Sequence, residues 1–271
     1  MCRSRNKETL FKFDAARFEH ADYKEYSQYA EALKPYVRDI EIDLHTHLEN
    51  DAKILFEGAQ GTFLDTTHGT YPYVTSSSTL AAGICAGAGV GPSKMTHTLG
   101  VIKAYTTRVG QGAMPTENAE MDAFFDHTQA REFGTTTGRK RRVGWFDGVL
   151  ARTAVRLNGL QSLAVTKLDI LDRFDQIKLC IAYKLNDKQL NYVPSLADDL
   201  QAVTPIYETM AGWKEPTSGI KSYEQLPPNA RAYLERLSQL CDTPISLISL
   251  GPERENTILL KNPFCLKSSV C

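Results

Sequence analysis

The 271-residue sequence lacks the features that mark several large classes of protein. Its six cysteines are scattered without paired short spacing, which argues against a structural zinc site or a disulfide framework and favours a reducing compartment. The formal net charge is only −1, so the chain has no general attraction to nucleic acids or anionic membranes. No apolar run approaches the roughly 20 residues that cross a bilayer, and the first residues lack the apolar core of a secretory signal. We therefore expect a cytoplasmic protein with no membrane or nucleic-acid partner.

Glycine is absent from residues 1–50, which are instead rich in charged and aromatic residues. Their pattern predicts helices over Tyr23–Leu33 and Asp39–Asn50. His45 and His47 have a spacing that resembles a metal site, but on a helix they point about 200° apart and cannot bind one ion. We expect a helical segment over residues 1–50, and a second part, residues 51–271, that carries the ligand contacts.

From residue 51 onward, short apolar runs alternate with helical patterns. The predicted strands are Lys53–Phe56, Leu99–Ala104, Leu163–Val165, Lys178–Lys184, Pro244–Ser249 and Asn256–Leu260. The predicted helices are Ala119–Phe133, Gly148–Asn158 and Asn229–Leu240. This alternation predicts an α/β fold with a mostly parallel central sheet, helices on both faces, and nucleotide bound at the carboxyl edge of the strands.

Two segments have the composition of ligand-binding loops. The stretch from Glu57 to Ser78 holds three glycines and eight serines or threonines, so it is a poor core element and a good lining for a ligand. GTTTGRKRR, Gly134–Arg142, places four cations beside three threonines. A solvated basic turn or a nucleic-acid patch is the plainer interpretation of such a run. The neighbouring glycines and hydroxyls favour a small anionic ligand, since guanidinium groups bind carboxylates and phosphates in bidentate fashion.

A third segment, TKLD at Thr166–Asp169, follows an apolar strand. A carboxylate at Asp169 could accept hydrogen bonds from the ring N–H and the exocyclic amine of guanine, and adenine offers no such pair of donors. Four residues of this type also end many strands by chance. GAGVG, Gly87–Gly91, resembles a dinucleotide loop, but we expect it to serve close packing of a helix. The sequence does not decide whether His68 is structural or contacts substrate.

Together these segments resemble the adenylosuccinate synthetase family, in which GTP drives the ligation of L-aspartate to inosine monophosphate (IMP). The resemblance extends from about Ile54 to Pro263 and includes SLGP at Ser249–Pro252. By this resemblance, the IMP contacts would be Gln60, Thr75, Val109 and Arg139; the aspartate contacts Thr135, Thr136, Thr137, Gly138, Arg139, Lys140 and Arg141; and the GTP contacts Arg141, Lys167, Leu168, Asp169, Ser249, Leu250 and Gly251. From the residues alone, Gln60 could equally cap a turn, and Thr75 could begin a helix whose N-terminus would hold a phosphate.

The resemblance also implies Mg²⁺ as cofactor, a homodimer, and a phosphate-cradling glycine loop with a catalytic base and a histidine near the family's N-terminus. This chain shows no such loop, so we expect it to match the C-terminal portion of the family, with no catalytic residue or metal ligand of its own and no activity alone. The alternative is a catalytically dead remnant that binds purine nucleotide or dimerises with an intact copy. We expect the two binding elements, TKLD and the threonine–arginine turn, to converge on one cleft.

Overall fold

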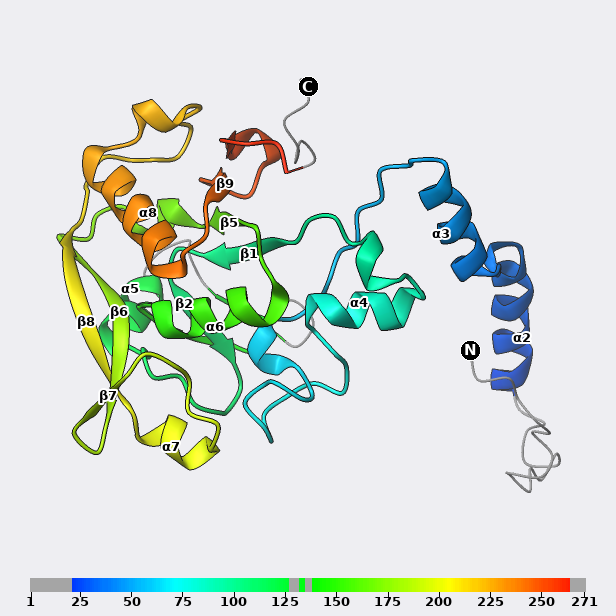
Figure 1. Ribbon diagram of the computed structural model, residues 1–271, viewed down its shortest axis with the longest axis horizontal. Coiled ribbons are helices and arrows are strands. Elements are labelled where there is room, and N and C mark those ends of the chain that lie inside the picture. Colours follow the sequence, from blue (N-terminus) through cyan, green and yellow to red (C-terminus); the bar gives the residue numbers. More distant parts are fainter. Residues whose placement is uncertain (1–20, 127–131, 135–137, 264–271) are drawn as a thin grey trace. The chain divides into compact units, whose positions relative to one another are not determined.

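The computed structural model describes residues 21–126, 132–134 and 138–263 (Figure 1). The chain divides into two compact units, Met1–Lys53 and Ile54–Cys271. The described part of the first unit consists of α2 (Ala21–Leu33), a short 3₁₀ turn η2 (Lys34–Tyr36) and α3 (Ile40–Glu49), which confirms both predicted helices. Across the described residues, no helix combines the length and the apolar character needed to span a bilayer.

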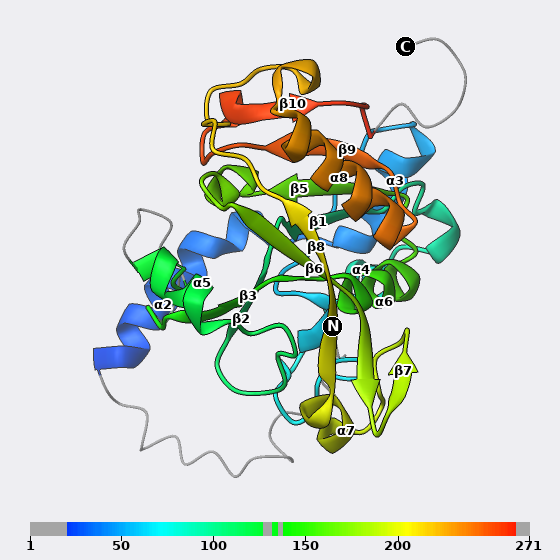
Figure 2. The ribbon, with the colours of Figure 1, turned by 90° about the vertical axis from the view of Figure 1, so that its left-hand side faces the viewer.

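A parallel sheet forms the centre of the second unit. It contains β1 (Leu99–Lys103), β5 (Ser162–Thr166), β9 (Ile245–Ser249) and β10 (Thr257–Leu259), in the order β1-β5-β9-β10. The first three strands are parallel and β10 pairs antiparallel with β9 at the edge (Figure 2). Four of the five residues of β5 are buried, as expected for a central parallel strand covered on both faces. The predicted α/β fold with a mainly parallel central sheet is confirmed.

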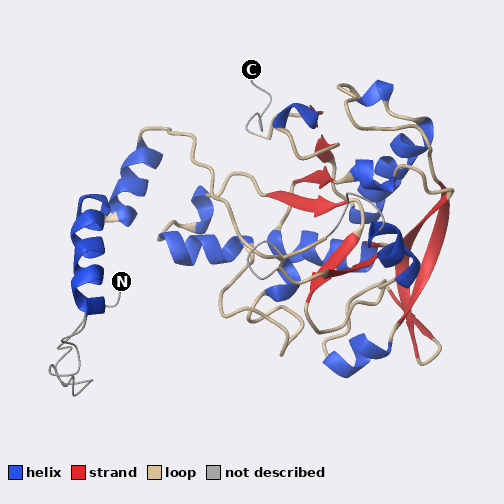
Figure 3. Cartoon of the chain, turned by 180° about the vertical axis from the view of Figure 1, so that it is seen from behind, coloured by secondary structure: helices blue, strands red, loops and turns tan. Residues whose placement is uncertain are grey.

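Two further sheets complete the second unit, in which helices and strands are interleaved (Figure 3). One contains β4 (Phe146–Asp147), β6 (Gln176–Leu185), β7 (Lys188–Leu190) and β8 (Thr204–Ala211). The other is an antiparallel ribbon of β2 (Thr106–Val109) and β3 (Arg141–Gly144). The sequence predicted no strand over either segment, and Arg141 and Arg142 were expected in a ligand-binding loop. The two segments form strands because each supplies the other's backbone hydrogen bonds, which an apolar pattern does not reveal.

The helices of the second unit are α4 (Ala81–Ala88), α5 (Ala119–Asp126), α6 (Gly148–Asn158), α7 (Ala197–Ala202) and α8 (Pro228–Cys241). Short 3₁₀ turns are η3 (Thr62–Leu64), η4 (Pro92–Lys94), η5 (Leu168–Leu171), η6 (Tyr223–Gln225) and η7 (Arg254–Asn256). Helix α6 has the predicted bounds because both ends are capped. The Asp147 carboxylate accepts from the amides of Val149 and Leu150, and Gly159 ends the helix in the left-handed conformation.

Three predictions were wrong. Lys53–Phe56 forms no strand, because no described strand pairs with it, and Leu55 is 77% exposed. The helix predicted over Ala119–Phe133 is described as α5 over Ala119–Asp126, and residues 127–131 lie outside the described part of the chain. The predicted bounds were wrong at Phe133, which pairs with Lys140 in an antiparallel bridge.

The third wrong prediction is that GAGVG, Gly87–Gly91, serves the close packing of a helix. A Cβ on Gly87 would meet nothing within 4 Å, and Gly89 ends α4 with a φ of 70°. The close approach falls on Gly83, whose added Cβ would lie 2.7 Å from the Ser78 hydroxyl.

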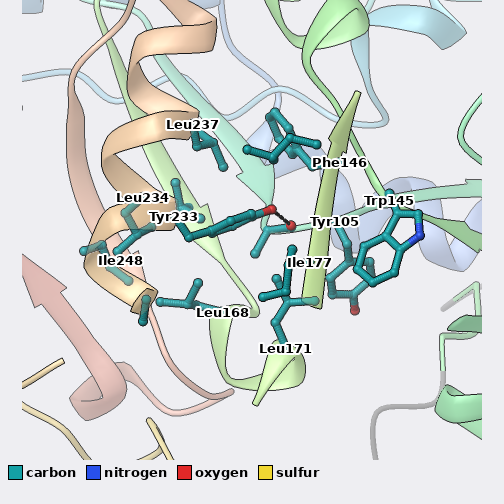
Figure 4. Packing of buried hydrophobic residues seen from close by; sticks show 14 of the residues in the cluster. Tyr105, Trp145, Phe146, Leu168, Leu171, Ile177, Tyr233, Leu234, Leu237 and Ile248 are labelled. Atoms are coloured by element: carbon teal, nitrogen blue, oxygen red, sulfur yellow. Dashed lines mark hydrogen bonds between the residues drawn. The ribbon is translucent and has the colours of Figure 1, made fainter. Parts of the chain in front are cut away.

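The main hydrophobic core packs α8 against the parallel sheet (Figure 4). Leu234 and Leu237 of α8 lie with Ile248 of β9 in this cluster, and all three are buried. The hydroxyl of the buried Tyr233 donates a 2.5 Å hydrogen bond to the carbonyl of Ala104, directly after β1. Helix α8 therefore fixes the backbone at the carboxyl end of β1, where the candidate site lies.

Candidate functional site

The carboxyl ends of three parallel strands bring separate sequence segments to one edge of the sheet. Lys103 at the end of β1 is in register with Thr166 at the end of β5. Val165 of β5 is in register with Ile248 of β9, one residue before that strand ends. The segments that follow the three strands therefore begin at the same edge, which is where ligands bind in open α/β sheets.

A buried carboxylate, Glu132, connects these segments. Its Oε2 atom lies 2.9 Å from Nζ of Lys103 and 2.9 Å from Nη1 of Arg141. Its Oε1 atom lies 3.1 Å from Nζ of Lys167 and accepts a 2.6 Å hydrogen bond from the Tyr105 hydroxyl. We call these five residues the Glu132 cluster. Through it, Lys167 of the TKLD element and Arg141 of the basic hairpin share one carboxylate.

Burial and charge act in opposite directions on the Glu132 cluster. The Glu132 side chain is 2% exposed, and burial alone would raise its pKa. The hydrogen bond from Tyr105 and the nearby charges of Lys103 and Lys167 outweigh burial and lower the pKa of Glu132 to about 2. Burial lowers the pKa of Lys103 to about 8, although Glu132 opposes this shift. Three cations thus surround one carboxylate, and the surplus positive charge suits an anionic ligand.

The TKLD element presents an unsatisfied acceptor. The Oδ1 atom of Asp169 is buried and has no hydrogen-bond partner among the described residues, and burial raises the pKa of this carboxyl. A buried carboxylate oxygen without a donor is unfavourable unless a ligand supplies one. Lys167, with a φ of 60°, begins the turn that places Asp169 here. The Leu168 side chain is fully buried in the core, so only its backbone can face a ligand.

The SLGP turn lies at the end of the adjacent strand β9. The Ser249 hydroxyl donates to the carbonyl of Gly251 over 2.9 Å, and the amide of Leu250 donates to the carbonyl of Asn256 over 2.9 Å. A Cβ on Gly251 would lie 2.6 Å from Nδ2 of Asn256, so a larger residue here would have to displace the Asn256 side chain. Leu250 is fully buried and anchors the turn, as Leu168 anchors TKLD.

The basic segment forms a hairpin above Glu132. The amide of Gly134 donates to the carbonyl of Arg139, and the amide of Arg141 donates to the carbonyl of Glu132, both over 2.8 Å. Gly138 has a φ of 62°, the left-handed conformation that glycine tolerates best. The predicted aspartate contacts Thr135, Thr136 and Thr137 lie outside the described residues, while Gly138, Arg139 and Lys140 are exposed. The Nε atom of Arg141 is buried and has no hydrogen-bond partner within the described part of the chain.

Asp65 organises the hydroxyl-rich loop from Glu57 to Ser78. Its side chain is buried and accepts four hydrogen bonds: from the amides of Thr67 and His68 on Oδ1, and from the Ser78 hydroxyl and the Thr79 amide on Oδ2. Burial would raise the pKa of Asp65, but these donors hold it well below its usual range. The backbone of His68 thus has a structural role.

We expect Asp65→Asn to lower the free energy of unfolding by about 2–3 kcal/mol at pH 7, because two of the four donors would face an amide nitrogen. Because the pKa of Asp65 is lower in the folded state, its stabilising effect is present above about pH 4 and is lost as the pH falls further. Urea unfolding at pH 7 and pH 3 checks this. The difference from wild type should shrink at pH 3, and Asp187→Asn, at a side chain 93% exposed, should change little at either pH.

Arg108 connects this loop with the β2–β3 ribbon. Its Nη2 atom donates to the Thr70 hydroxyl over 2.8 Å and to the carbonyl of Tyr73 over 3.0 Å. The next residue, Val109, is the cross-strand partner of Arg141. The ribbon therefore places a predicted IMP contact, Val109, beside a predicted GTP and aspartate contact.

The remaining predicted IMP contacts lie in the loop itself. Gln60 is exposed and has a φ of 61°. Thr75 is partly buried, and its amide donates to the carbonyl of Leu64 over 2.8 Å. The alternative that Thr75 begins a helix is not met, because α4 begins only at Ala81, after Leu80. Two shallow surface cavities of about 350 and 470 Å³ lie elsewhere, and no predicted contact lines either of them.

Sequence reasoning missed four members of the site. Glu132 was assigned to a helix, Lys103 lay within the predicted strand Leu99–Ala104, and Tyr105 lay directly after it. Arg108 directly precedes the predicted contact Val109 but was not itself predicted. A signal existed for Lys103, since a charged residue that directly ends an apolar strand lies at the ligand edge of an α/β sheet. No local signal existed for Glu132, whose role depends on three cations from distant segments.

Comparison with known proteins identifies the family. The family model described as adenylosuccinate synthetase matches residues 3–258. The adenylosuccinate synthetase of Geotalea uraniireducens is 50% identical over 242 residues, which cover 89% of this chain and 56% of that protein. The corresponding protein of a Picosynechococcus species is 52% identical over 242 residues, covering 89% and 54%.

A solved structure agrees with the sequence comparisons. The fully ligated adenylosuccinate synthetase from Plasmodium falciparum superposes with a TM-score of 0.83 at 35% identity, over 91% of this chain and 60% of that one. The chain thus spans about half the length of the curated relatives that it matches. With the match over residues 3–258 and the shared fold, the chain belongs to the adenylosuccinate synthetase family.

Proposed function

We propose that this chain supplies the guanine-recognition element, the aspartate loop and part of the IMP site of an adenylosuccinate synthetase. The complete reaction is the GTP-dependent ligation of L-aspartate to IMP, giving adenylosuccinate, GDP and phosphate. The observation that carries the proposal is the Glu132 cluster, in which Lys167 of the guanine element and Arg141 of the aspartate hairpin contact one carboxylate. Two binding elements that are 26 residues apart in the chain (167 minus 141) thereby act on the same site.

In this proposal, Asp169 accepts hydrogen bonds from the ring N–H and the exocyclic amine of guanine. Its unpartnered Oδ1 atom supports this role, because guanine would supply the donor that the protein does not. Lys167 would lay its aliphatic stem along the base, and the turn at Ser249, Leu250 and Gly251 would flank it. Only the backbone of Leu168 and Leu250 would contribute, since both side chains are buried.

The phosphate and carboxylate groups of the substrates would contact residues of the basic hairpin. The Arg141 side chain is 26% exposed, and its guanidinium suits a phosphate oxygen of GTP, while the exposed Arg139 suits a carboxylate of aspartate and the IMP phosphate. Lys140, Gly138 and the three preceding threonines would complete the aspartate contacts. Gln60, Thr75 and Val109 would hold IMP, from the loop that Asp65 and Arg108 organise.

The reaction transfers the γ-phosphoryl group of GTP to the six-oxygen of the purine, and the aspartate amine then displaces phosphate. Such transfers depend mainly on positioning and on neutralising charge, and this chain's residues would contribute both. Mg²⁺ is expected for the family, but the described residues contain no group of three or more histidine, cysteine, aspartate or glutamate side chains suited to a metal ion.

The proposal predicts selective binding of guanine nucleotides. Because adenine lacks the paired ring N–H and exocyclic amine that guanine would offer Asp169, we expect GDP to bind at least about 10-fold more tightly than ADP, which corresponds to the loss of one charge-assisted hydrogen bond. Isothermal titration calorimetry of the full chain with each nucleotide measures this difference. The two nucleotides carry equal charge, so attraction to phosphate alone would give equal affinities. Equal affinities for GDP and ADP, or no binding of either, would contradict the proposed function.

A further inference from the structure

We propose that Glu132 is a positioning residue that sets the Lys167 side chain for guanine recognition and fixes it relative to the aspartate hairpin. This inference rests on the proposed function of the TKLD element. It assigns to Glu132 an indirect role, through Lys167 and Arg141, rather than contact with a substrate.

The geometry of the carboxylate supports a positioning role. Each oxygen of Glu132 contacts two donors: Oε1 contacts Lys167 and Tyr105, and Oε2 contacts Lys103 and Arg141. The backbone carbonyl of Glu132 also accepts the amide of Arg141 over 2.8 Å. Backbone and side chain therefore both hold the hairpin strand that carries Arg141, and Oε1 holds the Lys167 ammonium group at the end of its flexible side chain.

The different exposure of Glu132 and Lys167 distinguishes a positioning role for Glu132 from direct contact with a ligand. The Glu132 side chain is 2% exposed, whereas that of Lys167 is 40% exposed. A ligand can therefore reach Lys167 but not the carboxylate that holds it. With its ammonium group tied to Oε1, Lys167 has fewer conformations to lose when a base packs along its stem, and preorganisation of this kind strengthens binding.

A positioning role and a simple charge effect predict opposite results. Neutralising Glu132 leaves Lys103, Arg141 and Lys167 without their shared counter-charge, so charge alone would strengthen the binding of every phosphate-containing ligand. If Glu132 positions Lys167, its neutralisation weakens the binding of ligands that carry guanine, while ligands with phosphate alone bind equally well or more tightly.

The test compares Glu132→Gln with the wild-type chain, using GDP and inorganic pyrophosphate as calorimetric probes. We expect Glu132→Gln to bind GDP about 10-fold more weakly, as for the loss of a charge-assisted hydrogen bond, and to bind pyrophosphate at least as tightly as the wild type. The control is Glu117→Gln, which removes another carboxylate paired with an arginine, Arg142, and lying outside the Glu132 cluster. It should leave the ratio of the two affinities unchanged.

Tyr105→Phe provides a milder second variant in case Glu132→Gln fails to fold. It removes only the hydroxyl that donates to Oε1 and keeps the ring packed against Phe125. We expect a two- to threefold weaker affinity for GDP and no change for pyrophosphate. An unchanged GDP affinity in the folded variants, or an equal weakening of both probes, would overturn the inference while leaving the proposed function intact. A wild-type chain that does not bind GDP would overturn the proposed function, and this inference with it.

Discussion

Asp169→Asn is expected to remove the preference for guanine and to create a preference for xanthine. The carboxylate accepts from two guanine donors in the proposed complex, whereas an asparagine amide offers one acceptor and one donor. Xanthine differs from guanine in presenting a carbonyl oxygen where guanine has its exocyclic amine, so it matches the amide. We expect the affinity for GDP to fall about 100-fold, and xanthosine diphosphate to bind the variant more tightly than GDP does.

Calorimetric titration of the wild-type chain and of Asp169→Asn with GDP, xanthosine diphosphate and pyrophosphate measures this change in base preference. Pyrophosphate serves as the internal control, because a folded variant with an intact phosphate region should bind it as the wild type does. A change of preference from guanine to xanthine distinguishes altered base recognition from misfolding, because a misfolded site would lose its affinity for both nucleotides. If Asp169→Asn retained the wild-type order of affinities, Asp169 would have no role in selecting the base, and its buried Oδ1 atom would need another explanation.

The fold could be predicted where one segment contains its own signal. Helix α6 was predicted with its correct bounds because Asp147 and Gly159 cap it within the same stretch of sequence. Strand β5 was found because nearly all of it is buried. Lys53–Phe56 has the composition of a strand but no described neighbour, and a strand is stable only when its backbone groups are paired.

The site could be predicted only in part, for the same reason. TKLD and the basic hairpin were found because glycine, hydroxyl and charged residues are concentrated in them. Glu132 was missed because the sequence around it contains no sign of its contacts with Lys103 and Lys167. Those two lysines come close to Glu132 only through the parallel register of β1 and β5. Residues 135–137, three of the predicted aspartate contacts, lie outside the described part of the structure.

Gly144→Ala is expected to have the largest effect on stability. Gly144 ends β3 and forms an isolated bridge with Glu117, and a Cβ at this position would lie 2.0 Å from the carbonyl oxygen of Thr116. The obstacle is backbone and cannot rotate away, as a side chain could. The strand or the Thr116 segment must therefore move, and we expect the free energy of unfolding to fall by about 3 kcal/mol or more.

Gly87→Ala is the matched control for this substitution. A Cβ on Gly87 would meet nothing within 4 Å, and the residue lies in α4, where alanine is the better helix former. We expect this variant to be more stable than the wild type by roughly 0.5 kcal/mol. Urea unfolding of the two variants gives the comparison. If Gly144→Ala and Gly87→Ala had equal free energies of unfolding, the Thr116 segment would be able to move without cost and would not constrain β3.

The hydrogen bond from Tyr233 to Ala104 has a consequence for the order in which the molecule is built. It joins residues 129 positions apart, and Ala104 lies between Lys103 and Tyr105, which both contact Glu132. During synthesis on the ribosome, every member of the Glu132 cluster emerges before the helix that anchors this backbone. The edge of the sheet that carries the Glu132 cluster can therefore reach its final form only after α8 has been made.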